Sequence, residues 1–150
     1  MKMSLFSIRE VTGDLFSAGN EYSMCHCVAA DLRMGKGIAI KFRNKFGQLE
    51  VLQQQNVHPG GVAIIKDGQR FIYNLVTKQS SWGKPTYQLM HSSLTAMRQH
   101  MIDHQIRKLA LPRIGCGLDG LSWSKIKDML CELFQQDDIE LIVYNYKPEK

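Results

Sequence analysis

Short apolar runs alternate with longer amphipathic segments along the chain. Four runs have the length and composition of buried strands, at residues 5–11, 24–28, 109–111 and 139–144. Two more, at residues 62–65 and 71–76, lie on either side of Asp67-Gly68, a pair that can supply the positive backbone angles of a tight hairpin. We therefore expect six strands, and we expect the two around this turn to pair antiparallel.

Three segments repeat apolar residues at the spacing of a helix. One begins after Gly37, one near Pro85, which suits a first helical turn, and one after Ser122, which suits an N-cap. Their apolar positions are Ile38, Ala39, Phe42 and Phe46; Met90, Leu94, Met97 and Met101; and Ile126, Met129, Leu130, Leu133 and Phe134. Helices interleaved with strands, plus one hairpin, predict an α/β sandwich around a mixed sheet.

Size and charge narrow the class of protein. The chain has 150 residues, 44% of them hydrophobic, and we expect residues 1–150 to form a single domain. Its 19 basic and 14 acidic residues give a formal net charge of +5, which favours anionic partners without choosing among them. No apolar run approaches the ~18 residues of a membrane span, so we expect a soluble, unsecreted protein that does not enter membranes.

The four cysteines lack the paired spacing of a zinc site. A domain of this size does not need disulfides to stabilise its core, so reduced thiols in the cytosol or nucleus fit best. We expect neither a structural metal nor a bound cofactor.

Two glycine-containing segments can bind an anion. Residues 111–123 run from an apolar strand through three glycines into a helix, and residues 31–39 also lead into a helix. Glycines let backbone N–H groups approach an oxyanion, and a helix start adds positive charge. Two such loops suit a diphosphate. From composition alone, ordinary strand-to-helix turns remain the alternative, as does a bare turn at Gly13-Asp14.

Six segments in a fixed order carry a more specific signal. They are Gly13-Asp14-Leu15-Phe16, His26-Cys27, residues 33–39, Leu75-Val76-Thr77-Lys78, Lys84-Pro85-Thr86-Tyr87 and residues 112–119. Together they resemble the macrodomain family and, within it, the terminal ADP-ribose protein glycohydrolase branch, over residues 8–146. The resemblance implies a three-layer α/β/α fold with a central mixed sheet, and ADP-ribose lying across the carboxyl ends of its strands.

The resemblance also implies a set of ligand-binding residues. Asp14 would accept a hydrogen bond from the adenine amino group, Leu15 would help to form the base pocket, and Tyr146 would stack on adenine. Ala29 stands where the family commonly carries a small hydroxyl residue, so one polar contact to the ligand is expected to be missing. The diphosphate and the distal ribose would be held mostly by backbone N–H groups of Gly35, Gly37, Ile38, Ala39, Arg113, Ile114, Gly115, Cys116, Gly117 and Leu118.

Lys78 and Asp119 match the two catalytic positions of that branch. A lysine that ends a buried strand is partly desolvated, which favours the neutral amine that acts as a nucleophile. In the branch's mechanism the lysine attacks the distal ribose and forms a covalent adduct, while the aspartate moves protons as general acid and base. Without the resemblance, a surface lysine and a turn carboxylate would be the preferred interpretations.

Three other signals carry less weight. His100 and His104 are four residues apart on a predicted helix but lack the glutamate of a zinc-protease motif, so we expect a solvated helix face. Cys116 lies in the glycine loop without a histidine at an informative spacing, so we interpret it as a small loop residue rather than a nucleophile. Trp82 either covers the distal ribose or packs a loop.

The leading functional hypothesis is a hydrolase that releases ADP-ribose from glutamyl or aspartyl side chains, with O-acetyl-ADP-ribose as a second ester substrate. The alternatives are a non-catalytic reader of ADP-ribose and a phosphatase acting on ADP-ribose 1″-phosphate. Expected partners are ADP-ribose and mono-ADP-ribosylated proteins, with ADP-ribosylated nucleic acid as an open substrate class. General nucleic-acid binding ranks lower. We expect a monomer in the nucleus or cytoplasm, and the resemblance adds a role in the DNA damage response.

Overall fold

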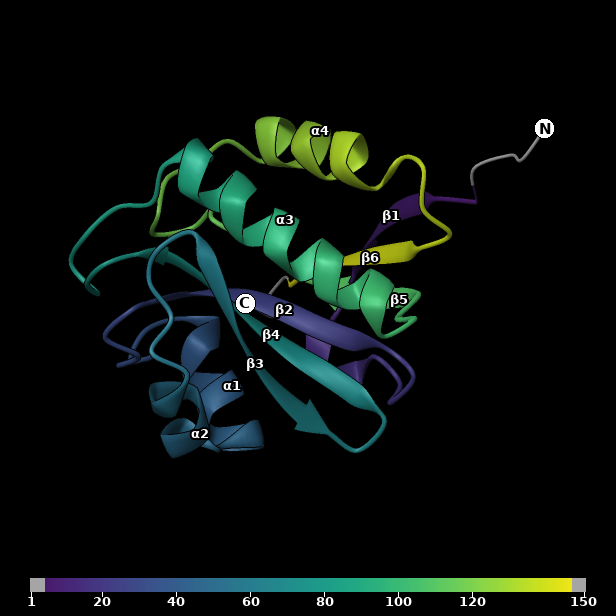
Figure 1. Ribbon diagram of the computed structural model, residues 1–150. Helices are drawn as coiled ribbons and strands as arrows, with labels where there is room; N and C mark the ends of the chain where they lie inside the picture. The colour runs from purple at the N-terminus through teal and green to yellow at the C-terminus, as the bar shows by residue number, and fades with distance from the viewer. Residues whose placement is uncertain (1–4, 147–150) are drawn as a thin grey trace.

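A mixed six-stranded sheet forms the centre of the computed structural model, which describes residues 5–146 (Figure 1). The strand order is β1-β6-β5-β2-β4-β3, and every neighbouring pair is parallel except β3 and β4. The strands are β1 (Ser7–Thr12), β2 (Ser23–Ala29), β3 (Gly61–Asp67), β4 (Arg70–Lys78), β5 (Lys108–Leu111) and β6 (Glu140–Asn145). All six predicted strands are present, with ends shifted by a few residues.

Helices cover both faces of this sheet. α3 (Tyr87–Asp103) and α4 (Trp123–Phe134) pack on one face, and α1 (Ile38–Phe46) and α2 (Leu49–Gln54) pack on the other (Figure 1). Successive side chains of a strand point to opposite faces, so β4 sends Tyr73 and Leu75 into the first layer and Ile72 and Val76 into the second. The predicted three-layer α/β/α fold is confirmed.

The structure corrects several local predictions. Pro85 lies outside α3, because Thr86 is the N-cap and its side chain accepts a hydrogen bond from the Leu89 N–H at 3.1 Å. Ser122 is the N-cap of α4 as predicted, but its side chain makes no capping hydrogen bond. In the hairpin turn only Gly68 has a positive φ, +63°, because Asp67 remains paired with Arg70.

Two short elements have no counterpart in the sequence predictions. α2 follows Gln48, a non-glycine residue with a φ of +57°. A 3₁₀ turn, η1 (Leu15–Ser17), follows Asp14, whose carboxylate accepts a hydrogen bond from the Phe16 N–H at 2.9 Å. Asp14 therefore caps a turn with its own side chain, as the turn interpretation expected.

The parallel strands bring the predicted site residues to one edge. β1, β6, β5, β2 and β4 all end at the same side of the sheet, and the segments that carry the six motifs follow or close those ends. Carboxyl ends of parallel strands are where open α/β sheets bind ligands. The sheet topology thus collects residues from positions 14 to 146 in one region.

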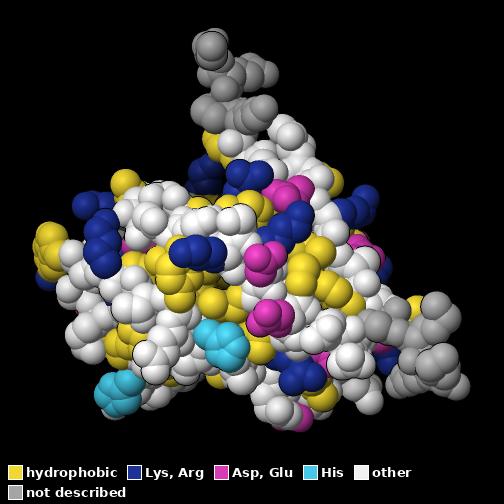
Figure 2. All heavy atoms as spheres, turned by 90° about the horizontal axis from the view of Figure 1, so that it is seen from above, with side chains coloured by type: hydrophobic (Ala, Val, Ile, Leu, Met, Phe, Trp, Pro, Cys, Tyr) yellow, Lys and Arg dark blue, Asp and Glu magenta, His cyan; other side chains and the backbone are white. Residues whose placement is uncertain are grey.

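The described residues 5–146 contain no helix that is long and apolar enough to cross a membrane. Across the same range, no cluster of three or more His, Cys, Asp or Glu side chains is placed to hold a metal ion. Figure 2 looks down on the face formed by α3 and α4, where basic side chains are spread among acidic and apolar ones. The single domain over residues 1–150 stays a prediction, since residues 1–4 and 147–150 lie outside the described range.

Candidate functional site

Lys78 and Asp119 form an ion pair at the carboxyl edge of the sheet. Lys78 is the last residue of β4, and Asp119 lies in the loop between β5 and α4, 41 residues later. Lys78 Nζ is 2.8 Å from Asp119 Oδ1, and each side chain keeps only 16% of its accessible surface. The two predicted catalytic residues are therefore in contact and largely screened from water.

Lys78 is partly buried, as expected for a lysine that ends a buried strand, and its Nζ donates a hydrogen bond to Asp119 Oδ1 at 2.8 Å. This contact gives a proton on Nζ a direct path to a carboxylate. The neutral amine expected from the sequence stays a prediction.

A thiol at the end of β2 borders the pair. Burial, with a smaller contribution from the nearby Asp119 carboxylate, raises the pKa of Cys27 to about 12. Cys116, in the glycine loop, donates a weak hydrogen bond from Sγ to the Ile114 carbonyl at 3.1 Å, and burial raises its pKa as well. Both groups remain thiols at neutral pH, so neither is an activated nucleophile.

The loop after β5 has a backbone that needs glycine at two positions. Gly115 and Gly120 have φ angles of +74° and +79°. A Cβ on Gly115 would lie 2.8 Å from the Met90 side chain and 3.0 Å from that of Leu121, whereas a Cβ on Gly120 would meet nothing within 4 Å. Gly115 thus allows the loop to press closely against α3, which fixes the loop's path beside Asp119.

A large open cavity lies along the same edge, with a volume of about 950 Å³. Its walls come from the ends of β1 and β6, the start of α1 and the loop after β5. Eight of the predicted ligand-binding residues line it: Asp14, Leu15, Gly37, Ile38, Arg113, Cys116, Gly117 and Tyr146. A volume of this order is enough for a nucleotide-sized ligand.

Tyr146 and Asp14 stand at the β1 and β6 end of the cavity. Tyr146 is 63% exposed, and the Lys41 ammonium lies 5.0 Å from its ring centre. Asp14 uses one carboxylate oxygen to cap η1, which leaves the other oxygen available as an acceptor. An aromatic face and a carboxylate oxygen at one end of a cavity suit a planar base that carries an amino group.

The remaining predicted residues do not line this cavity. Ala29 is 5% exposed and Ile114 is 2% exposed, so the side chains of both belong to the core. Leu118 is 71% exposed. Gly35 and Ala39 flank the residues at the start of α1 that do contact the cavity. Gly115 is the sixth predicted residue that does not line the cavity. A role for these six rests on their backbone groups and stays a prediction.

Glu10, on β1, is a residue of this region that sequence reasoning missed. Its carboxylate accepts hydrogen bonds from Lys127, Arg113, Trp123 and Asn145, at 3.0 to 3.3 Å. The bond from Lys127 is the main cause that lowers the pKa of Glu10 to about 2; those from Arg113 and Asn145 add to it, and partial burial opposes it. Glu10 therefore stays ionised and holds three cavity-lining residues in place.

Asp31 is a second residue that the sequence analysis did not identify. Its carboxylate accepts hydrogen bonds from the Ser81 N–H at 2.7 Å and the Ser81 hydroxyl at 2.8 Å, and from the Arg33 N–H at 3.1 Å. Partial burial opposes the shift, but these bonds lower the pKa of Asp31. The carboxylate thus ties the loop after β2 to the loop that follows Lys78.

Trp82 does not pack into the protein interior. Its side chain is 71% exposed, and the Arg33 guanidinium lies 4.5 Å from its ring centre. Trp82 thus packs on the side chain of a neighbouring loop while one face stays open to solvent, and its covering of the distal ribose stays a prediction. The expectation that His100 and His104 lie on a solvated helix face is corrected in part. The two rings stack with their centres 3.8 Å apart, and His100 Nδ1 shares a hydrogen bond of 2.8 Å with the Tyr73 hydroxyl.

Comparisons with known proteins agree with this fold and site. The model of the Macro domain family matches residues 25–130. The chain is 43% identical over 137 residues to ADP-ribose glycohydrolase OARD1 of Homo sapiens, covering 91% of this chain and 90% of that protein. It is 28% identical to DNA ADP-ribosyl glycohydrolase of Mycobacterium tuberculosis, covering 89% of this chain and 40% of that protein. The solved macrodomain of Thermus aquaticus DarG matches with a TM-score of 0.84 at 25% identity, covering 93% of this chain and 99% of that chain.

Proposed function

The chain belongs to the macrodomain family, and we propose that it is a hydrolase that releases ADP-ribose from the acidic side chains of proteins. The observation that carries this proposal is the Lys78–Asp119 ion pair, at 2.8 Å on the same strand edge as the 950 Å³ cavity. A reader would need only the cavity. A partly buried lysine and carboxylate in contact also supply a nucleophile and a proton acceptor.

We assign the cavity to ADP-ribose. Asp14 and Tyr146 would hold the adenine, and the start of α1 and the loop after β5 would surround the diphosphate with backbone N–H groups. The distal ribose would then extend towards Lys78 and Asp119. We infer this direction because the end of the cavity that suits adenine lies at β1 and β6, whereas the ion pair lies at β4 on the same edge of the sheet.

The proposed reaction has two steps. Asp119 takes a proton from Lys78, and the free Nζ attacks the anomeric carbon of the distal ribose, so that the bond to the carrier's carboxylate oxygen breaks and the carboxylate leaves. Asp119 gives its proton to the departing carboxylate. It then takes a proton from the water molecule that attacks the anomeric carbon and cleaves the bond between the ribose and Nζ, and it returns that proton to Nζ. The screened surroundings of the pair strengthen each electrostatic contact within it.

The chemistry extends to related substrates. O-acetyl-ADP-ribose also carries a carboxylate ester on its distal ribose, so we propose it as a second substrate of the same site. Nucleic-acid-linked ADP-ribose is a second class of carrier, and the relative from Mycobacterium tuberculosis is named for action on DNA. We propose a monomeric enzyme of the nucleus or cytoplasm whose main substrates are mono-ADP-ribosylated proteins.

Replacing the nucleophile tests the proposal. Lys78→Ala should lower the rate of ADP-ribose release from an ester-linked glutamyl peptide by on the order of 10³-fold or more, while the Kd for ADP-ribose measured by calorimetry changes by less than about threefold. Lys78→Arg keeps a positive charge beside Asp119 but lacks the amine, so it should be as inactive as Lys78→Ala. An undiminished rate in either variant would falsify the lysine mechanism.

A further inference from the structure

The segment that follows Lys78, residues 79–84, folds back beside Lys78. A Cβ on Gly83 would lie 3.9 Å from the Cβ of Lys78. Ser81 is held by Asp31 on one side, and Lys84 Nζ donates to the Leu118 carbonyl at 2.7 Å on the other. The segment is therefore pinned to the loop after β2 and to the loop that carries Asp119.

Trp82 is at the outer surface of this pinned segment. Its indole is 71% exposed, and the Arg33 guanidinium lies 4.5 Å from the ring centre. Arg33 is itself 61% exposed in its side chain, and its backbone carbonyl is fixed by Arg43 at 2.9 Å. The structure thus holds an exposed aromatic ring and a stacked guanidinium beside the position where the carrier would leave.

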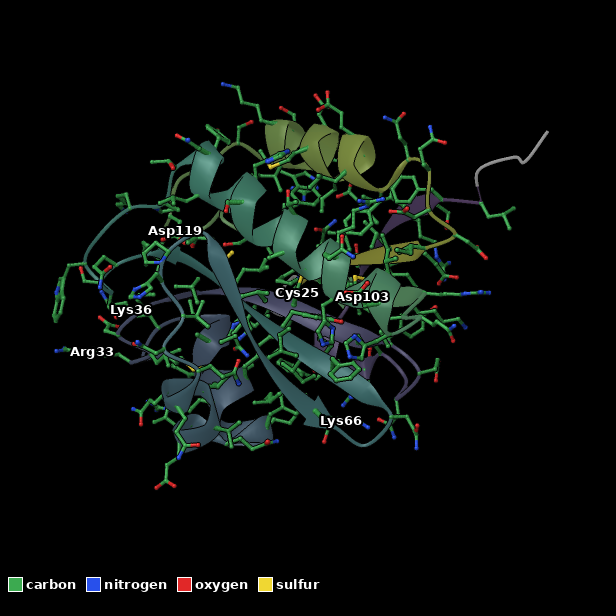
Figure 3. All side chains as sticks on the ribbon, viewed as in Figure 1. Cys25, Arg33, Lys36, Lys66, Asp103 and Asp119 are labelled. Atoms are coloured by element: carbon green, nitrogen blue, oxygen red, sulfur yellow. The ribbon has the colours of Figure 1, made fainter. Side chains whose placement is uncertain are left out.

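The charges around this pair of side chains are mainly positive. Arg33 and Lys36 are exposed at this end of the molecule, which also holds Asp119, whereas Lys66 and Asp103 lie towards the other end (Figure 3). Of the two acidic groups nearby, Asp119 is engaged by Lys78, and Asp31 is engaged by Ser81 and lies 3.9 Å from Arg33 Nε, so the two terminal nitrogens of the Arg33 guanidinium are the ones left to meet a carrier. A stacked guanidinium keeps its N–H edge available, and that edge matches a carboxylate in a bidentate geometry.

From this geometry we propose that Arg33 and Trp82 form a carrier-recognition surface that selects protein segments with further acidic residues beside the modified side chain. The inference rests on the proposed hydrolase function and names the class of substrate for it. Trp82 holds the aliphatic part of the carrier segment, and Arg33 pairs with a neighbouring carboxylate. Nucleic acid fits less well, because an extended strand needs a longer basic track than this pair of side chains supplies.

Paired substrates test this surface. Two peptides carry one ester-linked ADP-ribose on a central glutamate and differ only in having glutamate or lysine on either side of it; O-acetyl-ADP-ribose has no peptide at all. The wild-type protein should prefer the glutamate-flanked peptide by about tenfold in kcat/KM. Trp82→Ala and Arg33→Ala should each reduce that preference to about threefold or less and leave turnover of O-acetyl-ADP-ribose unchanged.

Controls separate this surface from other effects. Lys66→Ala removes the same charge at the opposite end and should keep the full preference, and Arg33→Lys, which keeps the charge without the planar fork, should keep part of it. Equal kcat/KM for the two peptides in the wild-type protein overturns the proposal. An equal loss of kcat/KM on O-acetyl-ADP-ribose in the variants also overturns it, because the segment would then shape the reacting pair itself. So does a loss of kcat/KM in the variants that is confined to an ADP-ribosylated oligonucleotide.

The same peptides distinguish failure of this inference from failure of the proposed function. If the wild-type protein cleaves none of the substrates, the hydrolase proposal is wrong. Calorimetry with the intact peptides then still decides the carrier surface, because the glutamate-flanked peptide should bind about tenfold more tightly and Trp82→Ala should remove most of that difference. Equal affinities would reject it.

Discussion

Two regions at the carboxyl edge of the sheet, the cavity and the Lys78–Asp119 pair, are built in different ways. The cavity region takes its walls from four segments, and one carboxylate, Glu10, binds three of the residues that line it. The reacting region depends on one ion pair between Lys78 and Asp119 beneath a single pinned segment. Affinity is therefore spread over many contacts, whereas turnover depends on two side chains. One substitution should stop turnover without removing affinity, and the reverse should require damage to a whole loop.

The largest effect is expected when Asp119→Asn breaks the reacting region alone. The amide cannot take the proton from Lys78, so the rate of ADP-ribose release should fall by about 10²- to 10⁴-fold. The cavity walls do not include Asp119, so the Kd for ADP-ribose should change by less than about threefold. Rates and calorimetry on the same preparation measure both quantities.

Asp103→Asn is the matched control, since Asp103 lies towards the other end of the molecule (Figure 3). It should change neither rate nor affinity. If Asp119→Asn weakened binding as much as it slowed release, the two regions would not be separable.

A broader effect is expected when Gly115→Ala distorts the loop after β5, which lines the cavity and also carries Asp119. The new methyl group would overlap Met90 and Leu121 at a φ of +74°, so the free energy of unfolding should fall by about 3 kcal/mol, from backbone strain and overpacking together. Affinity for ADP-ribose should fall with it.

Gly120→Ala provides the comparison, because its φ of +79° is equally unfavourable but its Cβ would meet nothing within 4 Å. It should cost about 1 kcal/mol. Urea denaturation of the two variants measures the difference, and equal costs would show that close packing of the loop on α3 is not what fixes it.

A smaller effect, on stability, is expected at low pH through His26, which packs against α1. His26 is fully buried and stacks on Phe42 of α1 at 3.7 Å; its Nε2 donates to Asn74 Oδ1 at 2.6 Å, and its Nδ1 has no partner. Burial lowers the pKa of His26 from 6.5 to about 4. The unfolded chain therefore takes up the proton first as pH falls, and stability that is complete above pH 6.5 is lost towards pH 4.

Between pH 7 and pH 5 the free energy of unfolding should fall by about 2 kcal/mol from this group. Urea denaturation at the two pH values measures the change. In His26→Gln, an amide can still donate to Asn74 but does not titrate, so most of the pH dependence in this window should disappear. A slope that survives in the variant would assign it to other groups.

Much of the fold could be predicted from the sequence, because its strands and long helices carry strong local patterns. Strands appear within a few residues of the apolar runs, and the Met90 to Met101 stripe is buried in α3 as its spacing predicted. α2 was missed because six residues are too few for a clear period, and because it follows a left-handed Gln48 that no residue type signals.

The site was harder to predict, because its contacts join distant positions. Asp119 lies 41 residues after Lys78, and the two were paired only through the family resemblance. Glu10 meets Arg113 and Lys127 at separations of 103 and 117 residues, and nothing local marks it among other strand residues. The cap formed by Asp14 needs only a neighbour two positions away, so that contact was predictable.

The central claim, that Lys78 forms a covalent bond to the distal ribose, is tested most directly by reductive trapping. The protein is incubated with ADP-ribose and a mild hydride donor, digested, and its peptides are weighed by mass spectrometry. We predict the added mass on the peptide that contains Lys78, and none in Lys78→Arg, although that variant still binds ADP-ribose. Repeated absence of an adduct from the wild-type protein, or an adduct on another lysine, would contradict the mechanism.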